Sequence, residues 1–296
     1  MTCFLRAVFC LLALLAPGCA MLGRYSPTAG LEQRGIFQPS KYPAGDWNPT
    51  AVLVQDANFT AEDGTRLHGW YVRHPQPRGQ ALLLHGNAGN VTLLAETLRV
   101  LNRRHNLAVL ALDYRGYGRS EGTPTEQGLY QDARAARRWL AHTENVAESD
   151  IILMGFSLGG AVAIDLAAKD GARGLILANS FTSLPDVAQH HWPWLPMKLV
   201  VSTQMNSLEK IKQYRGPLLL SHGDADEVVP YQQGVELFAA APGPKRLITA
   251  TGAKHNDPQP EEYRVAFDQF LGELPPLGQS AIRPAALEVS AEAAGP

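Results

Sequence analysis

A serine between glycines is the residue of this chain best suited to chemistry. Ser157 stands in Gly155-x-Ser157-x-Gly159, after the apolar run 151–154 and before a segment of small residues. A serine at a sharp strand-to-helix turn takes a strained backbone conformation that exposes its hydroxyl. Such a hydroxyl attacks a carbonyl carbon once a base removes its proton. The pattern therefore predicts a nucleophile at Ser157.

The base and the acid that such a serine needs must come from elsewhere in the chain. Neutral imidazole accepts a proton near neutral pH, and a carboxylate on its other nitrogen fixes the tautomer. Of the nine histidines, His255 is the candidate base. Asp224 and Asp226 both follow the apolar run Pro217–Leu220 closely, so both are candidate acids.

The elements that must position these residues are apolar runs alternating with helical patterns. We expect strands at 52–59, 66–72, 81–84, 107–112, 151–155, 175–178, 217–220 and 246–250, and helices at 91–103, 125–142, 158–169, 229–241 and 261–271. This alternation predicts an α/β fold with a mostly parallel sheet covered by helices on both faces. Ligands of such sheets bind beyond the carboxyl ends of the strands, where all the candidate residues stand.

Five motifs in order carry a resemblance to a known family. They are His85-Gly86-Asn87-Ala88-Gly89-Asn90, Asp113-Tyr114-Arg115-Gly116-Tyr117-Gly118, Gly155-Phe156-Ser157-Leu158-Gly159-Gly160, His222-Gly223-Asp224-Ala225-Asp226-Glu227-Val228-Val229-Pro230 and Gly252-Ala253-Lys254-His255-Asn256-Asp257. Over roughly residues 50–273 the chain resembles the alpha/beta-hydrolase superfamily, in particular serine-aminopeptidase-like hydrolases and hydrolases that remove acyl chains from protein cysteines. The order of its catalytic residues implies Ser157, Asp226 and His255, with Asp224 a turn residue.

An acyl-transfer site also needs hydrogen-bond donors for the negative oxygen of the tetrahedral intermediate. The backbone N–H of Leu158, just after the serine at a helix start, is one expected donor. The resemblance places the second donor at the backbone of Asn87. Asp113 and Arg115 are expected to hold the shape of their glycine-rich loop.

The first residues read as a leader. Residues 7–16 form an apolar run of ten, which is too short to span a bilayer and suits a signal peptide. The stretch 15–19 resembles a bacterial lipobox, which implies cleavage after residue 18 and a lipid on Cys19. The favoured location is therefore the cell envelope, as an outer-membrane or periplasm-facing lipoprotein; a soluble secreted or periplasmic protein and an uncleaved anchor stay open. All three cysteines precede residue 20, so no thiol of the body competes with Ser157.

The rest of the chain divides by composition. We expect a signal peptide at 1–18, a proline-containing tether at 19–50, the hydrolase domain at 51–273 and a poorly ordered tail at 274–296. An insertion at 180–210 interrupts the alternation and is expected to form a cap above the strand ends. Its apolar residues Trp192, Trp194 and Met197 either line an acyl pocket or pack on the sheet edge.

These observations favour a serine hydrolase that cleaves an acyl ester or thioester. A peptidase or amidase of the same fold, and a non-catalytic envelope protein that binds a ligand on this fold, are the alternatives. The expected partners are a small acylated substrate and, through the lipid, a membrane. The formal net charge of −2 argues against nucleic acid as a main partner. The residue spacings predict no metal site, no cofactor and no particular oligomeric state.

Overall fold

We describe a computed structural model of the chain for residues 36–278. The leader, Cys19 and most of the expected tail lie outside the described residues. The strands are β1 Gln38–Pro39, β2 Gln55–Thr60, β3 Arg66–Val72, β4 Gly79–Leu84, β5 Ala88–Gly89, β6 Leu107–Asp113, β7 Ile152–Phe156, β8 Gly174–Ala178, β9 Leu218–Gly223 and β10 Lys245–Ala250. The helices are η2 Val91–Leu94, α3 Ala95–Arg103, α4 Glu126–Glu144, η3 Glu148–Asp150, α5 Leu158–Asp170, α6 Leu184–His191, α7 Met197–Val200, α8 Ser207–Ile211, α9 Tyr231–Ala240 and α10 Glu261–Glu273.

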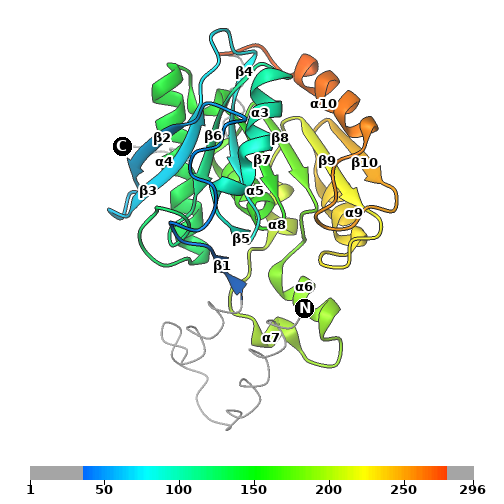
Figure 1. Cartoon of the computed structure of the whole chain (residues 1–296). Coiled ribbons are helices and arrows are strands. Elements are labelled where there is room, and N and C mark those ends of the chain that lie inside the picture. Colours follow the sequence, from blue (N-terminus) through cyan, green and yellow to red (C-terminus); the bar gives the residue numbers. More distant parts are fainter. Residues whose placement is uncertain (1–35, 279–296) are drawn as a thin grey trace, which may run out of the picture.

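Eight strands form one twisted sheet in the order β10-β9-β8-β7-β4-β6-β3-β2 (Figure 1). The six strands from β10 to β6 run parallel, whereas β3 and β2 run antiparallel to their neighbours. Parallel strands are buried on both faces, which explains their continuous apolar runs. The α/β class and the mostly parallel sheet expected from the sequence are confirmed.

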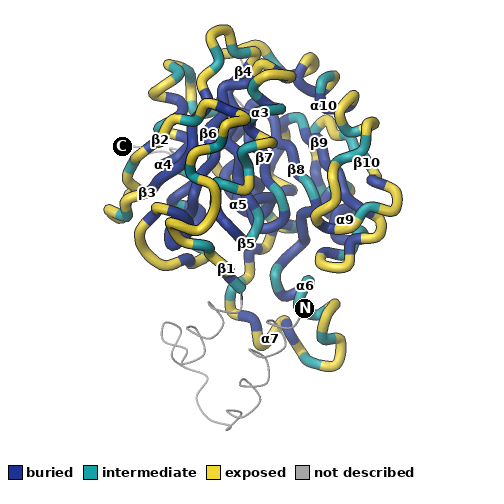
Figure 2. Tube along the Cα trace, in the orientation of Figure 1, coloured by how far each residue is buried: buried dark blue, intermediate teal, exposed yellow. Residues whose placement is uncertain are grey.

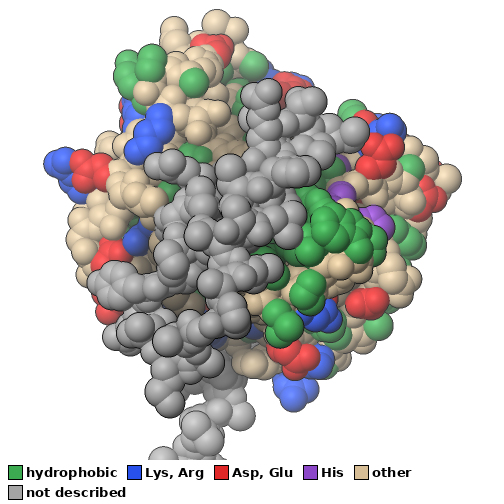
Figure 3. All heavy atoms as spheres, turned by 90° about the horizontal axis from the view of Figure 1, so that it is seen from below, with side chains coloured by type: hydrophobic (Ala, Val, Ile, Leu, Met, Phe, Trp, Pro, Cys, Tyr) green, Lys and Arg blue, Asp and Glu red, His purple; other side chains and the backbone are tan. Residues whose placement is uncertain are grey.

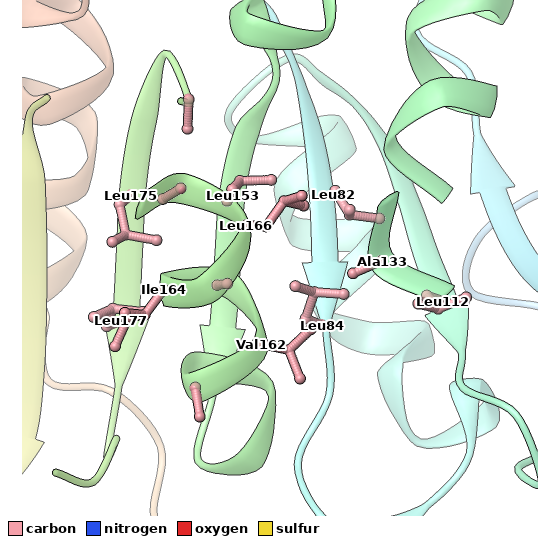
Figure 4. Close-up of a cluster of buried hydrophobic side chains, with 14 of the residues drawn as sticks. Leu82, Leu84, Leu112, Ala133, Leu153, Val162, Ile164, Leu166, Leu175 and Leu177 are labelled. Carbon is pink, nitrogen blue, oxygen red and sulfur yellow. The ribbon is translucent and has the colours of Figure 1, made fainter. Parts of the chain in front are cut away.

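The core lies in two layers on either side of this sheet. Alternate residues of each strand point to opposite faces. Leu82, Leu84, Leu153 and their counterparts pack against α4 and α5, as Figure 4 shows. The intervening side chains, such as Leu83 and Met154, pack against α3 and α10. Figure 2 shows this interior buried along the central strands of the sheet, whereas β2 and β10 at its edges are mostly exposed or partly exposed.

The packed domain begins earlier than the boundary at residue 51 expected from the sequence. Phe37 is only 3% exposed and belongs to the same core cluster as Leu82. β1 pairs in parallel with β5. Tyr42 N–H donates to Gly118 O at 2.9 Å, and Gly118 N–H donates to Ser40 O at 2.9 Å. We call residues 36–44 the strap; its proline and polar residues hid it within the expected tether.

The other end of the domain also extends past its expected limit. Arg173 Nε donates to Pro275 O at 2.8 Å, and Gly278 N–H donates to Asp150 Oδ2 at 3.0 Å. The expected tail therefore starts as ordered chain. Within residues 36–278, no helix is both long and apolar enough to cross a bilayer.

The insertion after β8 forms three short helices rather than an irregular stretch. α6 and α7 contact each other and hang below the sheet at the carboxyl ends of its strands (Figure 1). α8 returns to the body and packs against α5. Lys210 of α8 pairs with the buried Asp165 of α5 at 2.9 Å, which fastens the base of the cap.

Candidate active site

Ser157 stands at the turn between β7 and α5 with φ 52° and ψ −115°. This backbone conformation is costly for any residue with a Cβ. The glycines around it are required by close approach: a Cβ on Gly159 would lie 2.0 Å from Leu84 O, and one on Gly155 2.4 Å from Gly159 O. Ser157 N–H donates to Ala178 O at 2.9 Å, which ties the turn to the next strand. The turn is therefore the strained elbow that the sequence predicted.

His255 and Asp226 meet beside this elbow. His255 follows β10 and Asp226 follows β9, and His255 Nδ1 lies 2.7 Å from Asp226 Oδ2. The His255 ring lies 5.0 Å from the ring of Phe156, the residue before the serine. All three candidate residues are 8% exposed, so they are shielded from bulk water while retaining some access.

The competing carboxylate has a different task. Asp224 Oδ1 accepts a hydrogen bond from Gly252 N–H at 2.6 Å and thereby closes the loop. It makes no hydrogen bond with His255 among the described residues. Glu227 pairs with Lys254 at the surface, at 3.2 Å. The geometry therefore favours Asp226 as the partner of His255.

Asp226 is held as a carboxylate by four donors. Val228 N–H and Val229 N–H donate to Oδ1 at 2.8 and 2.9 Å. His255 reaches Oδ2, and so does His222 Nε2, at 3.4 Å. Burial acts to raise the pKa of Asp226, but the hydrogen bonds from His222, His255 and Val229 outweigh it and hold the pKa below its ordinary value. The group is therefore charged at neutral pH and suited to stabilise an imidazolium.

His222 is fully buried behind this carboxylate. Its Nε2 lies 2.9 Å from Val229 O, and a carbonyl oxygen only accepts, so Nε2 carries a proton. The side chain packs structurally, with its ring against Gly234. Its contact with Asp226 adds a role that the sequence did not indicate.

Asn179 is a site residue that the sequence reasoning missed. Its side-chain Nδ2 donates to His255 O at 2.6 Å, and its Oδ1 accepts from Gly223 N–H at 3.2 Å. It therefore joins the ends of β8 and β9 to the loop that carries His255. The available signal was an asparagine directly after the apolar run of β8; in the structure it takes a left-handed conformation with φ 48°.

The two expected oxyanion donors flank the elbow. Leu158 N–H is the first of α5, where helical N–H groups have no intrahelical acceptor. A Cβ on Gly86 would lie 2.9 Å from the Phe156 ring, so the loop that carries Asn87 runs alongside. The Asn87 side chain holds this loop to the strap: its Oδ1 accepts from Gln38 N–H at 3.2 Å, and its Nδ2 donates to Ile36 O.

The loop after β6 is braced as expected. Asp113 Oδ1 accepts from Val91 N–H at 2.9 Å, which fixes the start of η2 after the oxyanion loop. Asp113 Oδ2 lies 3.1 Å from Nδ1 of the buried His68. Arg115 pairs with the buried Asp132 at 2.8 Å. These residues shape the loops around the site.

The three expected pocket residues differ widely in exposure. Met197 is buried, Trp192 is partly buried and Trp194 is 68% exposed. Two hollows of about 410 Å³ each lie beside β2–β3 and beside α10, and no candidate catalytic residue lines either of them. Within residues 36–278, no group of three or more His, Cys, Asp or Glu side chains could hold a metal ion.

Comparison with known proteins supports the fold and the family. The family described as serine aminopeptidase, S33, matches residues 75–210, a stretch that includes Ser157 but ends before Asp226 and His255. The alpha/beta hydrolase domain-containing protein WAV2 of Arabidopsis thaliana is 34% identical over 207 residues, 64% of this chain and 67% of that protein. This chain belongs to the alpha/beta-hydrolase superfamily.

Two further comparisons cover more of the chain. The uncharacterised protein Rv2307c of Mycobacterium tuberculosis is 38% identical over 94% of this chain and 98% of its own length. The solved structure of the Pyrococcus furiosus esterase Pf2001 has a TM-score of 0.65 at 23% identity, covering 81% of this hydrolase and 98% of that chain. The latter likeness concerns the fold.

Proposed function

We propose that this hydrolase cleaves an acyl ester or thioester through an acyl-enzyme intermediate on Ser157. The observation that carries the proposal is the His255–Asp226 pair, joined at 2.7 Å beside the strained serine elbow. A base oriented by a buried carboxylate next to a serine at a strained turn is the arrangement that nucleophilic acyl transfer requires.

The proposed steps follow from the positions of these groups. The Ser157 hydroxyl attacks the acyl carbon while His255 Nε2 takes its proton. The oxyanion is bound by the N–H groups of Leu158 and Asn87, and each such donor contributes about 3–4 kcal/mol to the transition state. Collapse of the intermediate expels the alcohol or thiol, which takes the proton from His255. Water, deprotonated by His255, then attacks the acyl carbon and releases the acid and the free serine.

The test combines a covalent label with a substrate series. A fluorophosphonate probe is expected to label the wild-type chain and to fail on Ser157→Ala, and p-nitrophenyl esters of rising chain length report turnover. Asp224→Asn serves as a matched control, because it changes an aspartate two residues from the proposed acid. Labelling that persists in Ser157→Ala would refute the nucleophile. A folded wild-type chain that is neither labelled nor active would favour a non-catalytic binding protein.

An aminopeptidase is the second candidate, because the matching family is described as serine aminopeptidase. Such an enzyme needs a carboxylate to hold the substrate's amino group. Asp186 of the cap is already engaged by Thr182, Ser183 and Lys198, at 2.9, 2.7 and 3.0 Å. Glu209 is paired with Lys212 at 2.7 Å. Because both carboxylates are already paired, they favour an esterase or thioesterase over an aminopeptidase. Faster cleavage of aminoacyl p-nitroanilides than of p-nitrophenyl esters would reverse this preference.

We also propose that a lipid on Cys19 anchors the domain to a membrane of the cell envelope. Support comes from the lipobox-like stretch at 15–19 and the short apolar run before it. The domain then starts 17 residues beyond the lipid, at Ile36. Mass spectrometry of the mature N-terminus tests this, because an unacylated chain starting after residue 20 would contradict it.

A further inference from the structure

The cap carries an apolar surface that the proposed chemistry does not use. It consists of Pro193, Trp194, Pro196, Leu199 and Val200, which we call the cap surface. Leu199 is 87% exposed, Trp194 68% and Val200 37%. Large apolar side chains gathered on one surface in this way mark an interaction site rather than scattered exposure.

The exposure is fixed by the way the cap packs. Met197 and Val201 turn inward and are buried, so Leu199 and Val200 on the other side of the short helix face out. The Gln189 side chain holds the preceding loop in place: its Nε2 donates to Pro193 O at 3.1 Å, and its Oε1 accepts from Met197 N–H at 3.1 Å. The hydrogen bonds of Gln189 therefore fix the backbone of this segment in a conformation that leaves the cap surface exposed.

The cap surface lies at the end of the molecule where the described chain begins. α7 and β1 both stand below the sheet, beyond the carboxyl ends of the strands (Figure 1). Figure 3, viewed from below, shows hydrophobic side chains gathered on this face. Cys19 lies 17 positions before Ile36, and a chain of that length reaches at most about 60 Å even when fully extended. A lipid on Cys19 would hold this face close to a bilayer.

We propose that the cap surface docks on the bilayer, so that the active-site end of the domain faces the lipid. Tryptophan is enriched at the membrane–water interface, where its amphipathic ring suits the headgroup region. Lys198 stands among these residues with its side chain 70% exposed, and it suits an anionic headgroup although it also pairs with Asp186.

A bilayer fits the cap surface better than a second copy of the chain. Five side chains in one short segment cover much less than the roughly 800 Å² per partner that a stable protein interface buries. Docking on a bilayer requires no such minimum buried area, because the proposed lipid on Cys19 already keeps the cap surface close to the membrane. The proposal rests on the proposed anchor for its geometry and on the proposed hydrolase only for its consequence, which is access to acyl groups held in the membrane.

The experiment uses the absence of cysteine from the body of the chain. Leu199→Cys in the full-length protein is labelled with an environment-sensitive nitrobenzoxadiazole dye and reconstituted into phosphatidylcholine–phosphatidylglycerol vesicles with or without doxyl-labelled lipid. Arg104→Cys is the matched control, since Arg104 is exposed just before β6 begins, at the opposite ends of the strands. The unmutated chain gives the background labelling of Cys3, Cys10 and Cys19.

We expect the dye at 199, but not at 104, to shift to shorter wavelength and to be quenched by the doxyl lipid. Adding Trp194→Asp is expected to remove most of that quenching. Equal, water-like emission at both positions would overturn the proposal. A shift that grows with protein concentration and resists the doxyl lipid would mean that a second copy covers the cap surface, which also overturns it. Fluorophosphonate labelling of the same samples separates failure of the hydrolase from failure of the docking.

Discussion

Replacing Ser157 by glycine is expected to abolish activity and to stabilise the fold at once. With φ 52° and ψ −115°, Ser157 occupies a region that costs a residue with a Cβ about 1–3 kcal/mol. Glycine avoids this cost but gains unfolded-chain entropy worth about 0.4–1 kcal/mol. The middle values of these two ranges make the glycine variant about 1.3 kcal/mol more stable than Ser157→Ala, which also lacks the hydroxyl but keeps the Cβ.

Thermal unfolding of the two variants measures this difference. For a domain of this size, 1 kcal/mol corresponds to about 2–4 °C in Tm, so the glycine variant should melt about 3–5 °C higher than the alanine variant. Both variants should be inactive towards p-nitrophenyl esters. A glycine variant that melts at or below the alanine variant would show that the elbow stores no backbone strain.

Four further outcomes follow from the site. Asp226→Asn should lower kcat by about 10⁴, the scale for an imidazole left in the wrong tautomer, while Asp224→Asn should do far less; the reverse ranking would reassign the acid. The hydrogen bonds to Asp226 lower its pKa from 3.8, so they stabilise the fold fully above that pH. This contribution should be lost as the pH falls through the pKa of Asp226 in the folded state. Measuring Tm against pH for the wild type and for Asp226→Asn checks it. Asn179→Ala should displace His255 and lower kcat about a hundredfold with KM little changed, whereas an effect confined to Tm would make Asn179 merely structural. Cys19→Ser should move the protein out of the detergent-rich phase and end labelling by an alkyne fatty acid; retention of either would refute the lipid site.

The sequence predicted the elements best where burial dictates them. Strands buried on both faces, such as β4 and β7, must be apolar throughout, so their limits could be placed within a few residues. The elbow was equally visible, because close approach to Leu84 O leaves only glycine at position 159. The roles of individual side chains were harder to predict. Local periodicity and composition do not distinguish Asp226 from Asp224, and only the resemblance to the family's motif favoured Asp226.

Long-range polar contacts could not be predicted at all. Asn87 meets Ile36 and Gln38 across about fifty residues, and nothing in the local pattern of the strap signals that pairing. Asn179 likewise acts through partners at the ends of other strands, His255 after β10 and Gly223 of β9. Such contacts depend on the assembled strand order, which local periodicity does not encode. The bilayer that we propose as the partner of the cap surface is not part of the chain, so local periodicity does not indicate it either.

The strap has a consequence for how the domain could ever leave a membrane. The strap directly follows the stretch that would link the domain to its anchor; it pins the Asn87 side chain and places Phe37 in the core. A protease that cut between residues 20 and 35 would shed an intact hydrolase. One that cut a few residues later, within the strap, would shed a domain whose oxyanion loop had lost its clamp. A shift of a few residues in the cleavage position thus decides whether the released domain keeps or loses its activity. By the same reasoning, we expect a recombinant chain that starts at residue 51, and so lacks the strap, to be inactive.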